Sequence, residues 1–324
     1  MTAYRLLADI GGTNARFALQ AEGSDFADVE VLACRDYDDI GAAMDAYLAR
    51  AGARGHATDA IRHAAVAIAN PVEGDFVRMT NHHWCFSIAA LRDARALDTL
   101  LVVNDFAALA MALPHLDEAG RERIGGDIAA TPGRPIGLIG PGTGLGVSGV
   151  VPAPGPGGTR WIALAGEGGH ASFAPVTRQE VDVLDALWEE HGHVSAERLL
   201  SGPGLEAIHR VLSGERLAAA AITARALDGT SAACRATVDV FCAMLGSVAG
   251  NVALTLGATG GMYIGGGIVP RLGSLFHASA FRARFEGKGR LRPYLARIPT
   301  WLVTEPYPAL RGGAVMLDAA TRQP

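Results

Sequence analysis

The stretch LLADIGGTNARFAL, from Leu6 to Leu19, has apolar residues on either side of a short polar centre. This pattern predicts two strands joined by a tight turn. Such a turn can direct backbone N–H groups at an anion, and this one carries a carboxylate. Its candidate ligand-binding residues are Asp9, Gly11, Gly12, Thr13 and Asn14.

A second glycine-rich stretch, PIGLIGPGTGLGVSGVV, runs from Pro135 to Val151. Glycine at every other position from Gly140 to Gly146 lets the backbone take positive φ and approach a ligand closely. Its candidate residues are Gly142, Thr143 and Gly144. Either stretch alone could be an ordinary hairpin. The pair, with a carboxylate in the first, favours two phosphate-binding hairpins, one from each half of the chain.

Other nucleotide-binding motifs are excluded by the residues present. A Walker A loop and a protein-kinase site each need a lysine. The chain has one lysine, Lys288, and it lies in neither stretch. The dinucleotide fingerprint G-x-G-x-x-G also fails, because the glycines at 142, 144 and 146 are spaced one residue too short.

Length and composition limit the remaining classes. A chain of 324 residues is long enough for two domains. Its net charge of -5 gives no support for a nucleic-acid or membrane-surface partner. Four scattered cysteines form no C-x-x-C pair, which fits a reducing, cytoplasmic location, and the N-terminal residues lack the signal-peptide pattern.

Residues 240–270 carry no charge, so a transmembrane segment is one interpretation. Eight glycines in this range favour a buried helix that leads into a buried strand instead.

Periodicity and turn residues predict a mixed α/β fold. Besides the two hairpins, the expected strands are 29–34, 63–69, 76–80, 100–103, 161–165, 261–264 and 298–304. The expected helices are 37–51, 87–96, 106–113, 177–190, 195–200, one after Gly204, 231–256 and 309–320. Residues 117–134 are expected to form a surface connection, and Leu113-Pro114 is the candidate crossing point between domains.

Polar residues follow several predicted strands. Asn104 and Asp105 come directly after the buried strand 100–103, and ligands bind at the carboxyl ends of strands in open α/β sheets. Capping the next helix is an alternative or additional role for Asp105. The other candidates, at strand ends or after glycines, are Glu167, His170 and Glu197.

Carboxylates, an amide and an imidazole make an acceptor-rich pocket that suits a hydroxyl-rich ligand such as a sugar. A metal site at Glu167, His170 and Glu197, or purely structural roles, are the alternatives. With the two phosphate hairpins, the pocket indicates phosphoryl transfer from a nucleotide to a sugar hydroxyl. Asp105 would be the general base, and Asp9 would orient Mg²⁺ through water.

The chain resembles the glucokinases of proteobacteria, within the superfamily of hexokinases, actin and Hsp70-type ATPases. The resemblance covers nearly the full length and rests on several motifs in the family's order. These are DIGGTNAR (9–16), TNHHW (80–84), NDF (104–106), GPGTGLG (140–146), EGGH (167–170), SAERLLSGPG (195–204), GGGIVPR (265–271) and KGR (288–290).

The resemblance implies glucose and ATP as substrates, with Mg²⁺. It assigns sugar binding to Asn104, Asp105, Glu167, His170 and Glu197, and the role of base to Asp105. The two hairpins would hold the ATP phosphates, and Gly265, Gly266 and Gly267 would flank the adenosine. The implied fold has two ribonuclease-H-like domains with mixed sheets around a central cleft, in a cytoplasmic homodimer. The first domain would be 1–113 completed by 305–324, and the second 114–304.

Two other functions stay open at this point. A non-catalytic sugar sensor is one, although the presence of both Asp9 and Asp105 argues against it. A kinase for another hexose, or one using polyphosphate or ADP, is the other. A related group of repressors and sugar kinases carries a cysteine-rich zinc motif after its E-G-G-H-like sequence. No cysteine lies between Cys85 and Cys234 here, so no zinc is expected.

Overall fold

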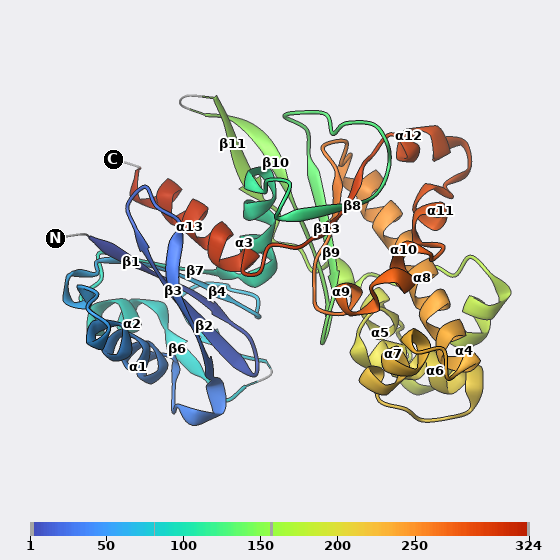
Figure 1. Cartoon of the computed structure of the whole chain (residues 1–324), viewed down its shortest axis with the longest axis horizontal. Coiled ribbons are helices and arrows are strands. Elements are labelled where there is room, and N and C mark those ends of the chain that lie inside the picture. The colour runs from blue at the N-terminus through green and yellow to red at the C-terminus, as the bar shows by residue number, and fades with distance from the viewer. Residues whose placement is uncertain (1–2, 81, 156–157, 323–324) are drawn as a thin grey trace. The chain divides into compact units, whose positions relative to one another are not determined.

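The computed structural model describes residues 3–80, 82–155 and 158–322. Contacts within the chain divide it into two units, Met1–Leu116 with Pro306–Pro324, and Asp117–Glu305 (Figure 1). The domain division expected from the sequence, at 113/114 and 304/305, stays a prediction.

The first unit is built on a mixed five-stranded sheet in the order β3-β2-β1-β4-β7. The first three strands are antiparallel, whereas β1, β4 and β7 run parallel. The sheet strands are β1 (Tyr4–Ile10), β2 (Asn14–Ala21), β3 (Phe26–Ala33), β4 (His63–Ile68) and β7 (Thr99–Asn104); β5 (Phe76–Arg78) and β6 (Cys85–Ser87) form a separate ladder. The helices are α1 (Ile40–Ala53), α2 (Ile88–Ala94), α3 (Asp105–Ala112) and α13 (Pro308–Thr321).

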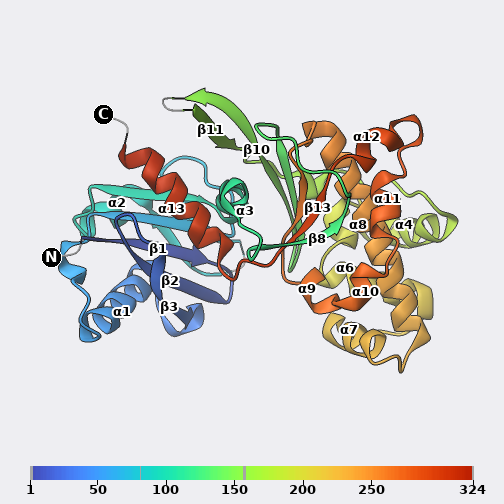
Figure 2. The ribbon, with the colours of Figure 1, turned by 45° about the horizontal axis from the view of Figure 1, so that its top comes forward.

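Successive side chains of β1 point to opposite faces of this sheet, as in any β-strand. Leu6, Ala8 and Ile10 pack in one core with residues of α1 and α2. Leu7 lies in another, with Leu310 of α13. Figures 1 and 2 show α1 and α13 on opposite faces of the sheet. Both faces are therefore covered, which explains the continuous apolar run before Asp9.

The second unit contains a six-stranded sheet in the order β11-β10-β9-β12-β13-β8. Its strands are β8 (Arg121–Gly125), β9 (Ile136–Pro141), β10 (Leu145–Gly155), β11 (Gly158–Ala163), β12 (Met262–Ile264) and β13 (Thr300–Val303). Its helices are α4 (Arg178–His191), α5 (Ala196–Leu199), α6 (Gly202–Ser213), α7 (Ala219–Leu227), α8 (Ala232–Leu256), α9 (Val269–Leu272), α10 (Ser274–His277), α11 (Phe281–Glu286) and α12 (Arg292–Ala296). Residues of β9, β12 and α8 share one large core.

The uncharged range 240–270 forms the buried helix and strand predicted for it. α8 begins after Ser231, whose side chain accepts the N–H of Cys234, and ends at Gly257, which has φ +60°. Among the described residues, α8 is the one helix long and apolar enough to cross a membrane, but two-thirds of its apolar window is buried inside this unit. The burial explains its composition as that of a core helix.

Both predicted hairpins are confirmed, as β1–β2 and β9–β10. The prediction for residues 117–134 is wrong in part, because β8 pairs antiparallel with β13 at the sheet edge. The elements that were not predicted are β6, α7, α9, α10, α11 and α12. In the polar loop 81–84, residue 81 lies outside the described residues.

Candidate functional site

The first turn links β1 to β2 in the first unit. The N–H of Gly11 donates to the carbonyl oxygen of Asn14 at 2.9 Å and closes the turn. Cys34 lies behind it: its N–H donates to the carbonyl oxygen of Thr13 at 2.9 Å, and its thiol to that of Gly11 at 3.4 Å. Burial raises the pKa of the Cys34 thiol, so it stays protonated and able to donate. The buried residue Cys34 therefore fixes the backbone of the turn through two hydrogen bonds.

Asp9 lies at the end of β1, directly opposite Arg16 of β2. A guanidinium nitrogen of Arg16 lies 3.1 Å from Oδ2 of Asp9. Burial raises the pKa of the Asp9 carboxyl, and the positive charge of Arg16 offsets part of that rise. The pairing leaves a carboxylate beside the turn with a cation next to it.

Asn104 and Asp105 lie where β7 passes into α3. Oδ1 of Asn104 accepts the N–H of Ala107 at 3.1 Å, so Asn104 caps the helix and Asp105 is its first residue. This corrects the alternative that made Asp105 the cap. Oδ1 of Asp105 accepts the N–H of Phe106 at 2.8 Å, which fixes the carboxylate at the positive end of the helix.

The second turn links β9 to β10 in the second unit. The N–H of Gly142 donates to the carbonyl oxygen of Gly144 at 2.8 Å, and the carbonyl oxygen of Gly142 accepts the N–H of Gly202 at 2.9 Å. The N-terminus of α6 thus supports the turn. Gly142 and Gly144 do not have positive φ, contrary to the expectation, and the close approach of Glu197 explains the glycine at 144.

Gly265, Gly266 and Gly267 follow β12 and lie against the end of β9. A Cβ on Gly266 would lie 2.4 Å from the carbonyl oxygen of Pro141, and its φ is +76°, so a glycine is required there. The N–H of Ile268 also donates to Pro141, at 3.2 Å. The glycine loop and the second turn therefore adjoin the same strand end.

Glu167, His170 and Glu197 lie together in the second unit. Nε2 of His170 is 4.0 Å from Oε2 of Glu167, and its Nδ1 is 3.9 Å from Oε1 of Glu197. The side chains of Glu167 and His170 are more than half exposed, and that of Glu197 is 32% exposed. A ligand can reach all three, which suits a binding role better than a purely structural one.

Two glycines of the E-G-G-H motif allow this grouping. They lie in the 3₁₀ turn η4 (Gly168–His170). A Cβ on Gly169 would lie 2.0 Å from the carbonyl oxygen of Leu145, and one on Gly168 would lie 2.8 Å from Val147. Only glycine lets this turn lie on β10 so closely, and the turn carries His170 with it.

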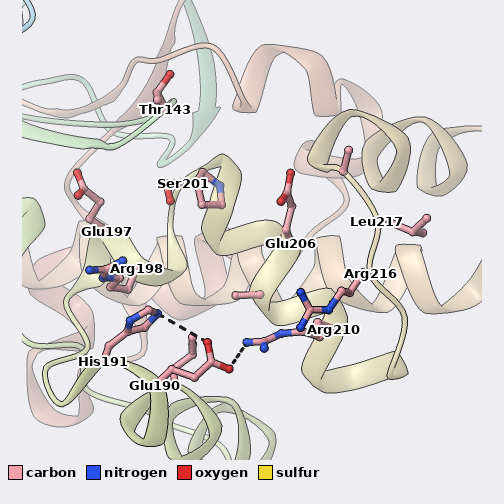
Figure 3. A pocket seen from close by; sticks show the side chains of 14 residues that line it. Thr143, Glu190, His191, Glu197, Arg198, Ser201, Glu206, Arg210, Arg216 and Leu217 are labelled. Atoms are coloured by element: carbon pink, nitrogen blue, oxygen red, sulfur yellow. Dashed lines mark ion pairs between the residues drawn. The ribbon is translucent and has the colours of Figure 1, made fainter. Parts of the chain in front are cut away.

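A cavity of about 630 Å³ lies beside the second turn, within the second unit. Thr143 and Glu197 line it at one end, as Figure 3 shows, and residues of α4, α5 and α6 and of the segment before α7 line the rest. Three arginines contribute to the lining: Arg198, Arg210 and Arg216. Arg210 pairs with Glu190 at 2.6 Å. The lining residues that the structure describes do not include Gly265, Gly266 or Gly267.

Three features of this region were missed from the sequence. The pairing of Arg16 with Asp9 could have been found from the hairpin register. If Gly12 and Thr13 form the turn, Gly11 lies opposite Asn14, and counting outward along the two strands places Asp9 opposite Arg16. The hydrogen bond from the N–H of Leu145 to Glu197, at 2.9 Å, had no sequence signal, because it joins a strand to a distant helix. The arginine-lined cavity had none either.

Comparisons with known proteins identify the family of this chain. The family model described as Glucokinase matches residues 6–320. The protein named Glucokinase from Chromobacterium violaceum is 52% identical over 319 residues, covering 97% of this chain and 89% of that protein. The protein named Bifunctional protein glk from Paraburkholderia xenovorans is also 52% identical over 97% of this chain, but the match covers 48% of it. This chain thus spans about half the length of such bifunctional relatives.

Among solved structures, the crystal structure of glucokinase from an Antarctic psychrotroph has a TM-score of 0.84 and 36% identity. The match covers 98% of this chain and all of that one. The predicted mixed α/β fold of the glucokinase and hexokinase type is confirmed. From the family model and these relatives, the chain belongs to the glucokinase family.

Proposed function

We propose that this chain transfers the terminal phosphoryl group of ATP to the 6-hydroxyl of glucose, forming glucose 6-phosphate and ADP. The observation that carries the proposal is the grouping of Glu167, His170 and Glu197 beside the second turn. In a member of the glucokinase family, this grouping supports the proposal that sugar and phosphates bind next to each other in one unit.

The sugar contacts proposed are hydrogen bonds to its hydroxyl groups. Carboxylates accept O–H donors with charge-assisted strength, and the imidazole of His170 can donate or accept. Asn104 and Asp105 of the first unit are proposed to bind the same sugar. A site built on such hydrogen bonds rejects analogues that lack one hydroxyl by about 10⁴–10⁵-fold.

Asp105 is the proposed general base. Its carboxylate takes the proton of the 6-hydroxyl as that oxygen forms a bond to the terminal phosphorus of ATP. The bond between this phosphorus and the bridging oxygen of ADP breaks, and ADP leaves. The hydrogen bond from the N–H of Phe106 supports the proposal, because it holds the carboxylate in one orientation.

The two turns are proposed to hold the ATP phosphates through backbone N–H groups, with Thr143 at the second turn. The cavity beside Thr143 has the size of a small-molecule site. Gly265, Gly266 and Gly267, which do not line that cavity, are proposed to lie near the adenosine.

Asp9 is the residue proposed to orient Mg²⁺ through water. A single carboxylate fits this cation, which usually binds one or two carboxylates together with substrate phosphates. Among the described residues, no group of three or more His, Cys, Asp or Glu side chains could hold a metal ion by itself. When bound, Mg²⁺ neutralises charge on the phosphates.

The deciding experiment is a coupled assay for ADP release with the purified chain and MgATP. Glucose, mannose, fructose and N-acetylglucosamine are tested in turn. Polyphosphate and ADP then replace ATP as donors, and there the sugar phosphate is measured directly because neither donor releases ADP. We expect turnover with ATP that is confined to glucose or far faster with it. Faster turnover with another hexose or donor would assign a different kinase. Absence of turnover together with calorimetric binding of glucose would identify a sugar sensor.

The family resemblance also supports a homodimer in the cytoplasm as part of this proposal. Sedimentation velocity over a range of protein concentrations tests the dimer directly, and a single monomeric species at micromolar concentration would contradict it.

A further inference from the structure

The two carboxylate oxygens of Glu197 face different parts of the second unit. Oε2 accepts the N–H of Leu145, the residue that follows the turn Gly142–Gly144, at 2.9 Å. Oε1 lies 3.9 Å from Nδ1 of His170. One side chain therefore contacts both the proposed phosphate turn and the proposed sugar-binding group.

The contact with the turn is very close. A Cβ on Gly144 would lie 2.5 Å from Oε2 of Glu197, so any residue with a side chain would displace the carboxylate. The backbone of Glu197 is also fixed. Ser195 caps its short helix, and the N–H of Ala196 donates to the carbonyl oxygen of Ala171 at 2.9 Å. Since Ala171 follows His170 directly, the carboxylate and the imidazole are held together.

This placement gives Glu197 opposite effects on the two substrates. A partly buried negative charge beside the turn opposes the binding of phosphates there. Sugar hydroxyl groups that donate hydrogen bonds to Oε1 offset part of this charge and hold the carboxylate on Leu145. The turn then becomes a better site for phosphates.

We infer that Glu197 couples the two substrates, so that bound sugar strengthens nucleotide binding through this one carboxylate. The inference rests on the proposed function, because it takes the turn as the donor site and Glu197 as a sugar ligand. Coupling is reciprocal, so bound nucleotide strengthens sugar binding by the same factor.

Calorimetry with the magnesium complex of a non-hydrolysable ATP analogue measures this coupling. The quantity of interest is the ratio of the analogue's Kd without glucose to its Kd with saturating glucose. For the natural chain we expect a ratio of about 5 to 20, within the usual range for coupled sites. In Glu197→Gln the amide oxygen can still accept the N–H of Leu145, but the charge is lost. We expect its ratio to fall to within about twofold of one.

Glu167→Gln is the matched control. Glu167 also contacts His170, at 4.0 Å, yet no hydrogen bond joins it to residues 142–145 in the part of the chain that the structure describes. This variant is expected to bind glucose more weakly and to keep the ratio of the natural chain. Glucose is titrated separately for each variant, so that saturation is comparable.

A second variant covers the case in which Glu197→Gln does not fold. Gly144→Ala places a methyl group against Oε2 of Glu197, and we expect it to lose the coupling as well. A natural ratio in the folded Glu197→Gln chain, or an equal loss in Glu167→Gln, would overturn the inference while glucose turnover continued. Failure of the proposed function looks different: the natural chain would neither bind nor phosphorylate glucose, and the inference would fall with it.

Discussion

At the scale of single residues, Asp105 is where the proposed chemistry is concentrated. Replacement by Asn keeps an oxygen that can accept the N–H of Phe106, so the end of β7 is expected to retain its structure. The base is lost, and we expect kcat to fall by roughly 10³-fold or more, with glucose affinity changed only a few-fold. Steady-state kinetics and calorimetry measure the two quantities. Asp93→Asn, at an exposed carboxylate of α2, is the control. Near-normal turnover in Asp105→Asn would refute the assignment.

Gly169 tests whether the E-G-G-H turn must lie directly on β10. A methyl group at Gly169 would lie 2.0 Å from the carbonyl oxygen of Leu145, so Gly169→Ala must move the turn and His170 with it. Overpacking of this kind usually costs 1–3 kcal/mol, and we expect KM for glucose to rise about tenfold or more.

Gly166→Ala is the control for this prediction. Gly166 precedes the same motif, but a Cβ there meets no atom within 4 Å and its φ is not positive. Its KM is expected to stay within about twofold of the natural value. An unchanged KM in Gly169→Ala would show that the turn does not hold the sugar-binding group in place.

At the scale of elements, α13 closes the first unit by packing on α3. Gly312 makes this possible, since a Cβ there would lie 1.7 Å from the carbonyl oxygen of Ala108, whereas one on Gly313 would lie 3.6 Å from Ala65. Gly312→Ala is therefore expected to lower the melting temperature by several degrees. Gly313→Ala gains up to about 1 kcal/mol of helix propensity and is expected to raise it or leave it unchanged. Thermal unfolding followed by circular dichroism gives the melting temperatures of the two variants. Equal changes in the two would contradict the conclusion that Gly312 is needed for the packing of α13 on α3.

The elements also show what the sequence could predict. α8 and the two hairpins follow from apolar runs bounded by serine and glycine, which act locally. β8 has the sequence RERIG and lies at the sheet edge, so hydrophobic alternation gives no signal, and only its pairing with β13 makes it a strand. α7 begins with three alanines and has no side-chain cap. Both were missed because non-local contacts decide them.

The same difference between local and non-local information applies to the candidate site. Strand ends and glycine spacing were enough to select Asp105 and Glu167 as candidates, and their chemical roles stay predictions. The distances among Glu167, His170 and Glu197 were not predictable, because the separate segments come together only through the backbone of η4 and α5. Their role in binding sugar stays a prediction.

At the scale of the whole molecule, the proposed sugar ligands are divided between the two units. In each unit, one proposed sugar ligand accepts a backbone N–H whose hydrogen exchange can be measured. The N–H of Phe106 donates to Asp105 in the first unit, and the N–H of Leu145 donates to Glu197 in the second. A ligand present at 100 times its Kd opposes any opening that releases it by about 2.7 kcal/mol. Glucose bound to both sets is therefore expected to slow hydrogen exchange at both amides, by up to about 100-fold.

Hydrogen exchange followed by NMR or mass spectrometry, with and without glucose, makes this measurement. Two helix caps remote from these residues in the sequence serve as controls, the N–H of Ala42 on Asp39 in the first unit and that of Cys234 on Ser231 in the second. We expect their exchange to be unchanged if they open locally with the sugar still bound. Protection at Leu145 without protection at Phe106 would mean that the second unit alone holds the sugar. Asp105 would then have no proton to accept from it, and the base would have to be sought among residues of the second unit.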